Sequence, residues 1–206
     1  MASYTVAITG ASGAIYGVTL LGRLAAAGHE VALVVSPDGV TVIREETGLD
    51  WGGEATVVRR ALDRRYRGRV TWWEPANFYA PIASGSHLSD GMIIAPCSMK
   101  TAAAVAHGLS ASLIERAADV MLKERRPLIV VPRETPLSSI HLENLLTLSR
   151  AGAHVVAAMP AFYHRPKSID DVVAFVVGRV LDHLGIPHDL VPRWGSDRPP
   201  RRTCER

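Results

Sequence analysis

Short apolar runs alternate along the chain with longer segments in which apolar residues recur every three or four positions. The runs have the length and branched side chains of buried strands, and the spaced segments have the period of amphipathic helices. We expect strands at 5–9, 30–35, 70–73, 92–95, 128–131 and 154–158. We expect helices at 14–27, 40–46, 57–66, 102–107, 112–124 and 168–184, and another that begins near 138. This alternation predicts an α/β fold with an open, mainly parallel sheet.

The first predicted strand ends in a glycine-rich turn that leads into the first helix. Gly10, Ser12 and Gly13 occupy this turn, and Gly17 follows one helical turn later. Small residues let a ligand approach the backbone, and the N–H groups of a first helical turn favour an anion, so a nucleotide-like ligand suits this place. The glycine spacing differs from the dinucleotide fingerprint Gly-x-Gly-x-x-Gly, which leaves tight packing of helix on strand as an alternative.

Two further strands end in small polar residues at the same predicted edge. Ser36 ends the second strand, and residues 96–101 join the fourth strand to an alanine-rich helix. Since ligands bind where the strand order of an open parallel sheet reverses, Ser12 and Ser98 are expected to face one crevice. Cys97 is interpreted as a buried structural thiol, because no histidine is placed beside it by the sequence.

Charged side chains follow the fifth strand and line the helix before it. Arg133 and Glu134 stand at a strand end close to two prolines that stiffen the turn, and a guanidinium there suits a phosphate. Arg116 and Lys123 share one stripe of the helix at 112–124, where Asp119 is able to neutralise them. The segment at 77–91 is rich in Pro, Gly and Ser and predicts a long functional loop.

The last predicted helix opens with Ser168 and Asp171 in capping-box spacing and ends before Gly185. It is apolar almost all round, which predicts burial against other subunits. Arg179 lies inside this apolar run, so we expect an anionic partner, either a carboxylate or a bound phosphate.

Composition bounds the possibilities further. The 206 residues are 48% hydrophobic and 21% charged, which predicts a single domain at 1–192 and a Pro/Arg-rich tail at 193–206. No bilayer-spanning run or signal peptide is recognised, so we expect a cytoplasmic protein without membrane contact. The two cysteines and the spacing of the histidines predict no metal site. The net charge of +3 and the clustered arginines favour phosphate-bearing small molecules over nucleic acid.

The turn sequence TGASGAIYG at 9–17 is similar to that of short-chain dehydrogenases, and Tyr163 and Lys167 have the Tyr-x-x-x-Lys spacing of that family. The dehydrogenase pair must share a helix, however, and Pro166 interrupts this segment. We therefore reject this interpretation.

A second resemblance covers nearly the whole chain. Together with APCSMKTAAAVAHG at 95–108, the specific block at 115–153, AFYHRPKS at 161–168 and GIPHDLVPRWG at 185–195, the turn resembles the flavin prenyltransferases of the UbiX type. The resemblance implies a Rossmann-like or flavodoxin-like three-layer fold that assembles as a dodecamer with each active site at a junction of subunits. It also implies metal-independent transfer of the dimethylallyl group of dimethylallyl phosphate to N5 and C6 of reduced FMN. The prenylated FMN would serve a UbiD-type decarboxylase.

The resemblance also assigns residues. The positions that match the family's FMN contacts are Gly10, Ala11, Ser12, Ser36, Ser98, Met99, Lys100, Thr101 and Arg133. The positions that match its dimethylallyl phosphate site are Arg116, Lys123, Glu134, Tyr163 and Arg179. Glu46 matches an acidic residue near flavin N5, and Glu134, Glu46, Ser12 and the released phosphate are candidates for proton transfer. Phe78 stands where family members carry Trp and would face the allyl group.

Two alternatives share the FMN residues. A decarboxylase related to the phosphopantothenoylcysteine enzymes would need a catalytic His on the first helix, and residues 14–27 contain none. A non-catalytic FMN-binding subunit of an aromatic-acid decarboxylase would have no use for Lys123, Glu134 and Arg179 together. The prenyltransferase interpretation is therefore favoured.

Overall fold

The computed structural model describes residues 1–192. These residues divide into two compact units, with the boundary between Ala158 and Met159. Residues 1–158, the sheet unit, contain all six strands and the helices that cover them, whereas residues 159–192, the C-terminal unit, contain one helix. The expected tail at 193–206 lies outside the described residues, and the expected single domain at 1–192 stays a prediction.

The sheet unit is built on six parallel strands in the order β3-β2-β1-β4-β5-β6. Their bounds are β1 Ser3–Ile8, β2 Glu30–Val35, β3 Val70–Trp73, β4 Gly91–Cys97, β5 Leu128–Pro132 and β6 His154–Val155. From β1 the chain moves outward to β2 and β3, and then returns to place β4 on the other side of β1. Thr5 of β1 therefore pairs with Ala32 on one side and Met92 on the other. The strand order reverses between β1 and β4, as in the expected Rossmann-like class.

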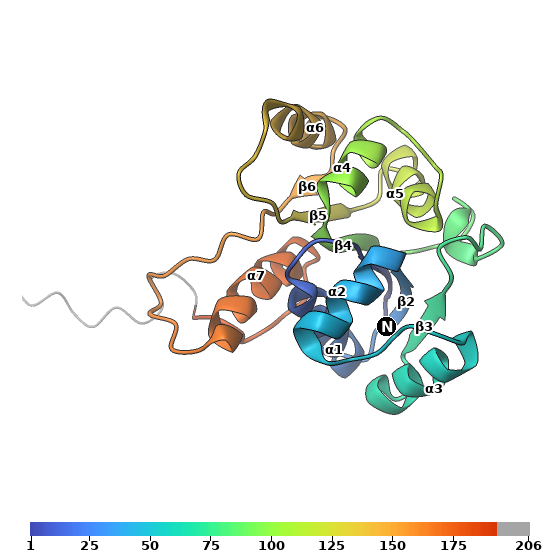
Figure 1. The fold of residues 1–206 in the computed structure, drawn as a ribbon, viewed down its shortest axis with the longest axis horizontal. Helices are drawn as coiled ribbons and strands as arrows, with labels where there is room; N and C mark the ends of the chain where they lie inside the picture. The colour runs from blue at the N-terminus through green and yellow to red at the C-terminus, as the bar shows by residue number, and fades with distance from the viewer. Residues whose placement is uncertain (193–206) are drawn as a thin grey trace, which may run out of the picture. The chain divides into compact units, whose positions relative to one another are not determined.

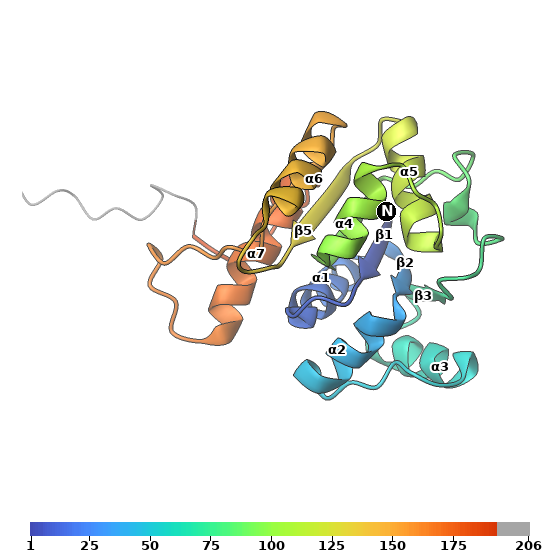
Figure 2. The ribbon, with the colours of Figure 1, turned by 45° about the horizontal axis from the view of Figure 1, so that its top comes forward.

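Helices cover both faces of this sheet, which is why every position of β4 and β5 is buried. Their bounds are α1 Ala14–Ala26, α2 Pro37–Thr47, α3 Ala55–Tyr66, α4 Met99–Ala106, α5 Leu113–Lys123 and α6 Ser139–Arg150. α1 packs on β1, β2 and β4 with α2 and α3 beside it, while α4 and α5 pack on β4 and β5 with α6 beside α4. Figure 1 and Figure 2 show these two groups on opposite sides of the sheet. The expected three-layer α/β fold is confirmed.

Several element bounds differ from the expected ones because side chains and neighbouring strands set them. β4 continues through Pro96 to Cys97, because Cys97 still pairs with Pro132 of β5. α4 begins at Met99 instead of residue 102, because the Ser98 hydroxyl accepts a hydrogen bond from the Thr101 N–H and caps the helix. α2 likewise begins at Pro37 behind a Ser36 cap.

The sixth strand is shorter than expected. Only His154 and Val155 form β6, although the backbone N–H groups of Val156 and Ala158 still donate to Val130 and Pro132. Residues 156–158 therefore run beside β5 with alternate hydrogen bonds and without strand geometry. The expectation of a full strand at 154–158 is wrong in its second half, because an edge strand has a partner on one side only.

The long segment between β3 and β4 contains one short 3-10 helix, η1 Pro81–Ala83, and is otherwise irregular as expected. Ala80 and Ile82 are buried in the same core as β4 and α5. The Arg116 Nε donates to the Ala83 carbonyl at 3.0 Å, and Arg126 donates to the Gly85 carbonyl at 3.1 Å. Two guanidinium groups from the α5 side thus fasten this loop along the helix.

The C-terminal unit is organised around α7 Ile169–His183. The predicted capping box is present: the Ser168 hydroxyl accepts from the Asp171 N–H, and the Asp171 carboxylate accepts from the Ser168 N–H. The Lys167 N–H also donates to that carboxylate at 2.8 Å. These hydrogen bonds, that from Lys167 first, lower the pKa of Asp171 below its ordinary value.

Candidate functional site

The first turn of α1 is closed by a carboxylate from α2. Glu46 Oε2 accepts hydrogen bonds from the backbone N–H groups of Gly13 at 2.9 Å and Ala14 at 2.8 Å. The sequence-based expectation that these N–H groups would face a ligand anion is therefore wrong for this structure. The anion that stabilises the helix N-terminus is a side chain of the same chain, because α2 packs against α1.

The glycines around this turn have packing roles. A Cβ at Gly17 would lie 2.2 Å from the Ala95 carbonyl oxygen, and one at Gly10 would lie 2.4 Å from Asp38 Cβ. Each position therefore excludes any side chain, so that α1 lies close to β4 and the turn lies close to α2. Tight packing, the alternative left open above, accounts for Gly10 and Gly17 without a ligand. Gly13 adopts a φ of 106°, a left-handed conformation that favours glycine.

The carboxyl ends of β1, β4 and β5 are joined by hydrogen bonds. The Arg133 Nε donates to the Ser12 carbonyl at 2.9 Å, and the Arg133 backbone N–H donates to the Cys97 carbonyl at 3.3 Å. The Thr9 hydroxyl donates to the Pro96 carbonyl at 2.9 Å and accepts from the Ser98 N–H at 2.8 Å. Ser12, Ser98 and Arg133 thus meet at the point of strand-order reversal, as predicted.

Three helix N-termini point to this edge. α1 begins after Gly13, α2 behind Ser36 and α4 behind Ser98, and the Ser36 hydroxyl accepts from the Gly39 N–H at 3.0 Å. Met99, Lys100 and Thr101 form the first turn of α4. The N-terminus of α1 is occupied by Glu46, so the partial positive charges of the α2 and α4 N-termini and the Arg133 guanidinium create the region that suits a phosphate. The positions that were expected to contact FMN, 10–12, 36, 98–101 and 133, all lie along this edge.

Sequence reasoning missed Thr9 and Tyr16. Thr9 is 1% exposed and links the two strand ends, and its only signal in the sequence is a hydroxyl at the end of a buried strand. The ring of Tyr16 packs on the turn, where a Cβ at Gly13 would lie 2.9 Å from Tyr16 Cδ2. Burial raises the pKa of Tyr16, Arg133 opposes this effect and Glu46 adds to it. Both charged groups of the edge, Arg133 and Glu46, therefore act on the pKa of the Tyr16 phenol.

Glu134 follows Arg133 and is exposed. Its Oε1 accepts a hydrogen bond from the Thr135 N–H at 3.0 Å, so the carboxylate is folded back on its own turn.

Cys97 is the last residue of β4 and is buried, which raises the pKa of its thiol to about 12. A thiol with such a pKa stays protonated near neutral pH, in agreement with a structural role.

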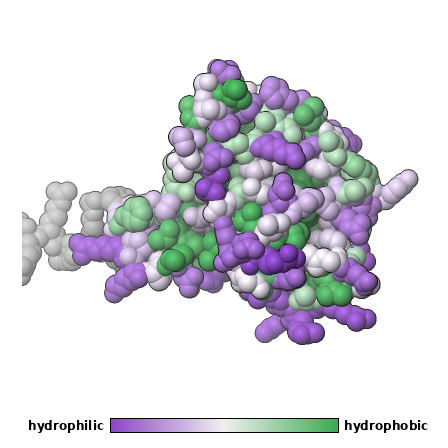
Figure 3. Space-filling model, in the orientation of Figure 1, coloured by the Kyte–Doolittle hydropathy of each residue, from purple (hydrophilic) through white to green (hydrophobic). Residues whose placement is uncertain are grey.

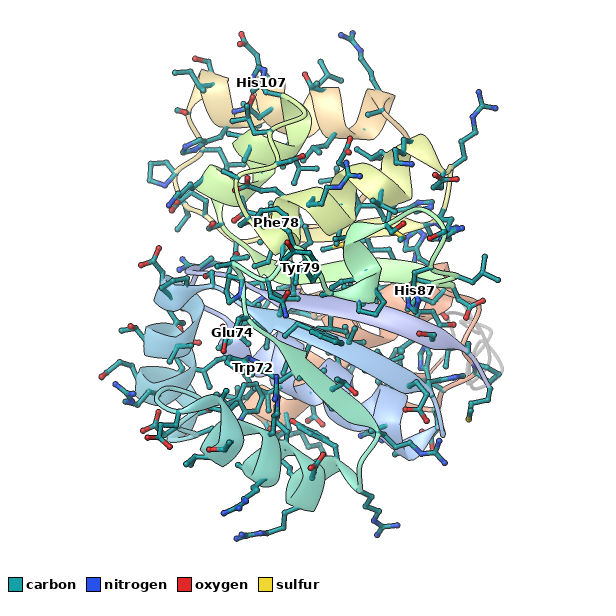
Figure 4. The ribbon with its side chains drawn as sticks, turned by 90° about the vertical axis from the view of Figure 1, so that its right-hand side faces the viewer. Trp72, Glu74, Phe78, Tyr79, His87 and His107 are labelled. Carbon is teal, nitrogen blue, oxygen red and sulfur yellow. The ribbon has the colours of Figure 1, made fainter. Side chains whose placement is uncertain are left out.

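The loop after β3 presents two neighbouring aromatic side chains. Phe78 is 46% exposed and Tyr79 is 100% exposed, and Figure 4 shows both on the loop, well separated from His87 further along it. Phe78, the candidate for the allyl-facing aromatic, therefore has a ring available to a partner. Tyr79 was not singled out by sequence reasoning, and only its exposure reveals it.

The cations of α5 lie apart from Glu134. The helix begins beside the carboxyl end of β3, where the Leu113 N–H donates to the Pro75 carbonyl at 2.7 Å. It ends near the opposite edge of the sheet, since the Pro127 carbonyl accepts from Met92 at the start of β4. Lys123, in the last turn, therefore lies near the amino ends of the strands.

These α5 cations also have partners within the chain. Arg116 forms an ion pair with Asp119 at 2.9 Å, as the sequence allowed, and Lys123 pairs with Glu124. The hydrogen bond from Lys123 is the main reason why the pKa of Glu124 is lowered. The expected convergence of Lys123 and Glu134 on one phosphate does not occur within a single chain, because α5 crosses the sheet from edge to edge.

Tyr163 and Arg179 belong to the C-terminal unit. The Arg179 side chain is 49% exposed and pairs with Asp182 one turn later at 2.9 Å. Within the single chain, the expected anionic partner of Arg179 is therefore a carboxylate, that of Asp182, and burial of Arg179 against other subunits stays a prediction. The Tyr163 ring lies edge-on to Phe175, with ring centroids 6.0 Å apart.

Comparisons with known proteins agree with this geometry. The Flavoprotein family model matches residues 2–181. A flavin prenyltransferase UbiX of Halalkalibacterium halodurans is 50% identical over 195 residues, covering 95% of this chain and 94% of that protein. The chain belongs to the UbiX-type flavin prenyltransferase family.

Two solved structures of this UbiX-type family extend the comparison. AnUbiX (PadA1), in complex with FMN and dimethylallyl pyrophosphate, is 41% identical, with a TM-score of 0.86 over 96% of this chain and 99% of that one. A dodecameric FMN-dependent UbiX-like decarboxylase from Escherichia coli O157:H7 is 46% identical, with a TM-score of 0.84 over 94% and 100%. The residues described for this UbiX-type chain contain no group of three or more His, Cys, Asp or Glu side chains that could hold a metal ion. No helix at 1–192 is long and apolar enough to cross a membrane.

Proposed function

We propose that this chain is a flavin prenyltransferase that joins the dimethylallyl group of dimethylallyl phosphate to reduced FMN. The observation that carries the proposal is its likeness, over 96% of its length, to a structure that holds FMN and dimethylallyl pyrophosphate. The edge at Ser12, Ser98 and Arg133 supports it, because small residues, helix N-termini and a guanidinium suit a phosphate-bearing ring system. When bound there, reduced FMN supplies the N5 and C6 atoms that receive the dimethylallyl group.

The binding residues each supply a group of the right chemistry. Ser36, Ser98 and Thr101 carry hydroxyls at two helix N-termini, and Lys100 adds an ammonium to the first turn of α4. Arg133 uses Nε for the Ser12 carbonyl, and its two terminal nitrogens can donate to an anion in parallel. Met99 and Ala11 are apolar and almost fully buried beside these groups. Together these groups would hold a flavin against the turn that contains Gly10.

The site is completed by other copies of the chain. Glu134 lies at the carboxyl ends of the strands and Lys123 near their amino ends, so both side chains reach one phosphate only if different subunits supply them. Arg116, Tyr163 and Arg179 would join Lys123 around the same anion. Exposed Ile140, Leu142 and Leu146 give α6 apolar side chains that suit assembly, and Figure 3 shows hydrophobic patches among hydrophilic residues at the top of the molecule, where this helix lies. We therefore infer a homododecamer with shared sites.

Charge separation explains the residue types. As the carbon–oxygen bond of the donor breaks, negative charge develops on the departing phosphate, where Arg116, Lys123 and Arg179 stabilise it. The allyl group becomes positive and is stabilised by the face of Phe78 in a site that excludes water. Closing the second bond requires protonation of the alkene and loss of a ring proton, for which Glu134, Glu46, Ser12 and the released phosphate are the candidates.

The test is mass spectrometry of the flavin after anaerobic incubation of the protein with reduced FMN and one of two donors, dimethylallyl phosphate or dimethylallyl pyrophosphate. We expect a flavin heavier by one C5 unit with dimethylallyl phosphate, and this product should activate a UbiD-type decarboxylase. FMN recovered unchanged with both donors, despite stoichiometric binding, would instead favour a non-catalytic FMN-binding subunit. Fractionation of cells is expected to place the protein in the cytoplasm.

A further inference from the structure

A hollow of about 690 Å³ lies between the end of α1 and the turn from α3 to β3. Gly22, Ala25, Ala26 and Gly28 line its α1 side, where no side chain is larger than a methyl group. Arg65, Tyr66, Arg67 and Arg69 line the other side. The volume is within the range of about 300–1,000 Å³ that is usual for small-molecule sites.

The charge of the hollow is strongly unbalanced. The hollow is lined by three arginines. Within the described residues 1–192, only Arg69 of these three forms an ion pair, with Glu30 at 2.5 Å. Arg65 is held over the ring of Tyr66, with its guanidinium carbon 5.7 Å from the ring centroid, and its Nε donates to the Tyr66 hydroxyl at 3.2 Å. Two of the three guanidinium groups are thus held in place, and the site carries more positive than negative charge.

The backbone conformation at Arg67 does not explain why this residue is an arginine. Arg67 follows the last residue of α3 with a φ of 53°, a left-handed conformation in which glycine is the least strained residue. A cation at a helix C-terminus complements the helix dipole, and Arg64 and Arg65 already supply that in the last turn. The dipole therefore does not account for a third guanidinium at the rim of a concave surface.

We propose that this hollow binds a small molecule that carries two or more phosphate groups. Arginine grips phosphate oxygens through parallel N–H donors, and three guanidinium groups around one hollow suit adjacent phosphates. The wall of glycine and alanine leaves room for the rest of the ligand. The outer surface around α3 in Figure 3 is largely hydrophilic, in keeping with a polar ligand.

The hollow is separate from the proposed FMN site. The Arg69 carbonyl accepts from the Val31 N–H, so this residue lies at the amino ends of β2 and β3, opposite the edge that contains Ser12 and Arg133. Occupancy of the hollow and prenyl transfer can therefore be measured independently, and either proposal can fail without the other.

The test is isothermal titration of the full chain with inorganic pyrophosphate, together with hydrogen exchange read by mass spectrometry at 22–28 and 65–69. Two substitutions change the hollow and are expected to leave the fold intact. Arg67→Gly removes a guanidinium where glycine fits the backbone better. Gly22→Leu fills the hollow without a change of charge, and a Cβ at Gly22 would meet no atom within 4 Å. Arg59→Ala on the same helix is the matched control, and Lys123→Ala removes the other predicted phosphate site.

We expect pyrophosphate to slow exchange in both segments of the wild-type chain and of the Arg59→Ala and Lys123→Ala variants. Affinity should fall at least tenfold in Arg67→Gly and in Gly22→Leu. Retained affinity in both of these variants, or loss in Lys123→Ala alone, would overturn the proposal, because the anion would then occupy another site. A change of oligomeric state in Arg67→Gly and Gly22→Leu without pyrophosphate binding in the wild type would make the hollow a subunit interface, which also overturns it.

Discussion

Glu46 on α2 caps α1: its Oε2 accepts a hydrogen bond from the backbone N–H of Ala14 at 2.8 Å. The same carboxylate accepts from Gly13, so one side chain satisfies two N–H groups that have no partner inside their own helix. An acidic residue proposed to act beside flavin N5 is therefore also a structural element of the glycine-rich turn. Its removal should affect both stability and catalysis.

The stability effect gives the first prediction. Glu46→Ala leaves two N–H groups of α1 without an acceptor and should lower the free energy of unfolding by about 1 kcal/mol. Glu45→Ala is the matched control, because Glu45 is the exposed neighbour on the same helix. Urea unfolding followed by circular dichroism measures both variants. Equal stability of the two variants would show that the Glu46 contact contributes nothing.

Two glycines of α1 give the second prediction. Gly17→Ala would place a Cβ 2.2 Å from the Ala95 carbonyl oxygen, so helix and strand must separate, at a cost of about 2 kcal/mol. Gly22→Ala, in the same helix, meets no atom within 4 Å and should stabilise the chain by about 0.5–1 kcal/mol. Thermal unfolding of the pair measures the difference. Similar shifts in both variants would contradict close packing at Gly17.

The separation of Lys123 and Glu134 gives the third prediction. Lys123→Ala and Glu134→Gln should each bind FMN and form no prenylated flavin, because each removes a group from the proposed donor site. If different subunits supply these side chains, coexpression of the two variants should restore activity. Random assembly leaves about a quarter of the sites with both groups intact.

Complementation is measured by prenylated flavin formed per bound FMN in the purified mixed oligomer. Mixing the two variants after separate purification is the control, since stable assemblies should not exchange chains. A coexpressed oligomer as inactive as either parent would refute the shared site. Unchanged turnover in either single variant would remove that residue from the mechanism.

The capping box of α7 gives a prediction on pH. The pKa of Asp171 is lowered in the folded chain, so its carboxylate stabilises the fold above the ordinary Asp value of about 3.9, and this contribution is lost as the pH falls through the lowered folded value. Asp171→Asn should therefore lower the melting temperature at pH 7, and the difference from wild type should vanish at strongly acidic pH. Asp170→Asn is the control, since Asp170 lies in the same turn. If Asp171→Asn lowered the melting temperature equally at both pH values, the charge of the Asp171 carboxylate would be excluded as the cause.

Short-range sequence patterns, namely hydrophobic periodicity and helix-capping residues, predicted most of the fold. The bounds of β2 and β3 follow from short branched runs, and the cap at Ser168 follows from its spacing to Asp171. The predicted strand ends place Ser12, Ser98 and Arg133 at a common edge, and the family resemblance of 9–17, 95–108 and 115–153 matches them to FMN contacts. Such features depend on neighbours within a few positions, or on a shared ancestry of the whole chain.

What the sequence determined by itself was therefore the succession of elements, their caps and the family. Only the tertiary structure decided which atoms meet: that Glu46 caps α1, that Arg133 holds the Ser12 carbonyl, and that Lys123 lies apart from Glu134. The physical reason is that hydrophobic period and capping act within one or two turns of chain. Contacts between helices and strand ends depend on how distant segments pack, which no local pattern records.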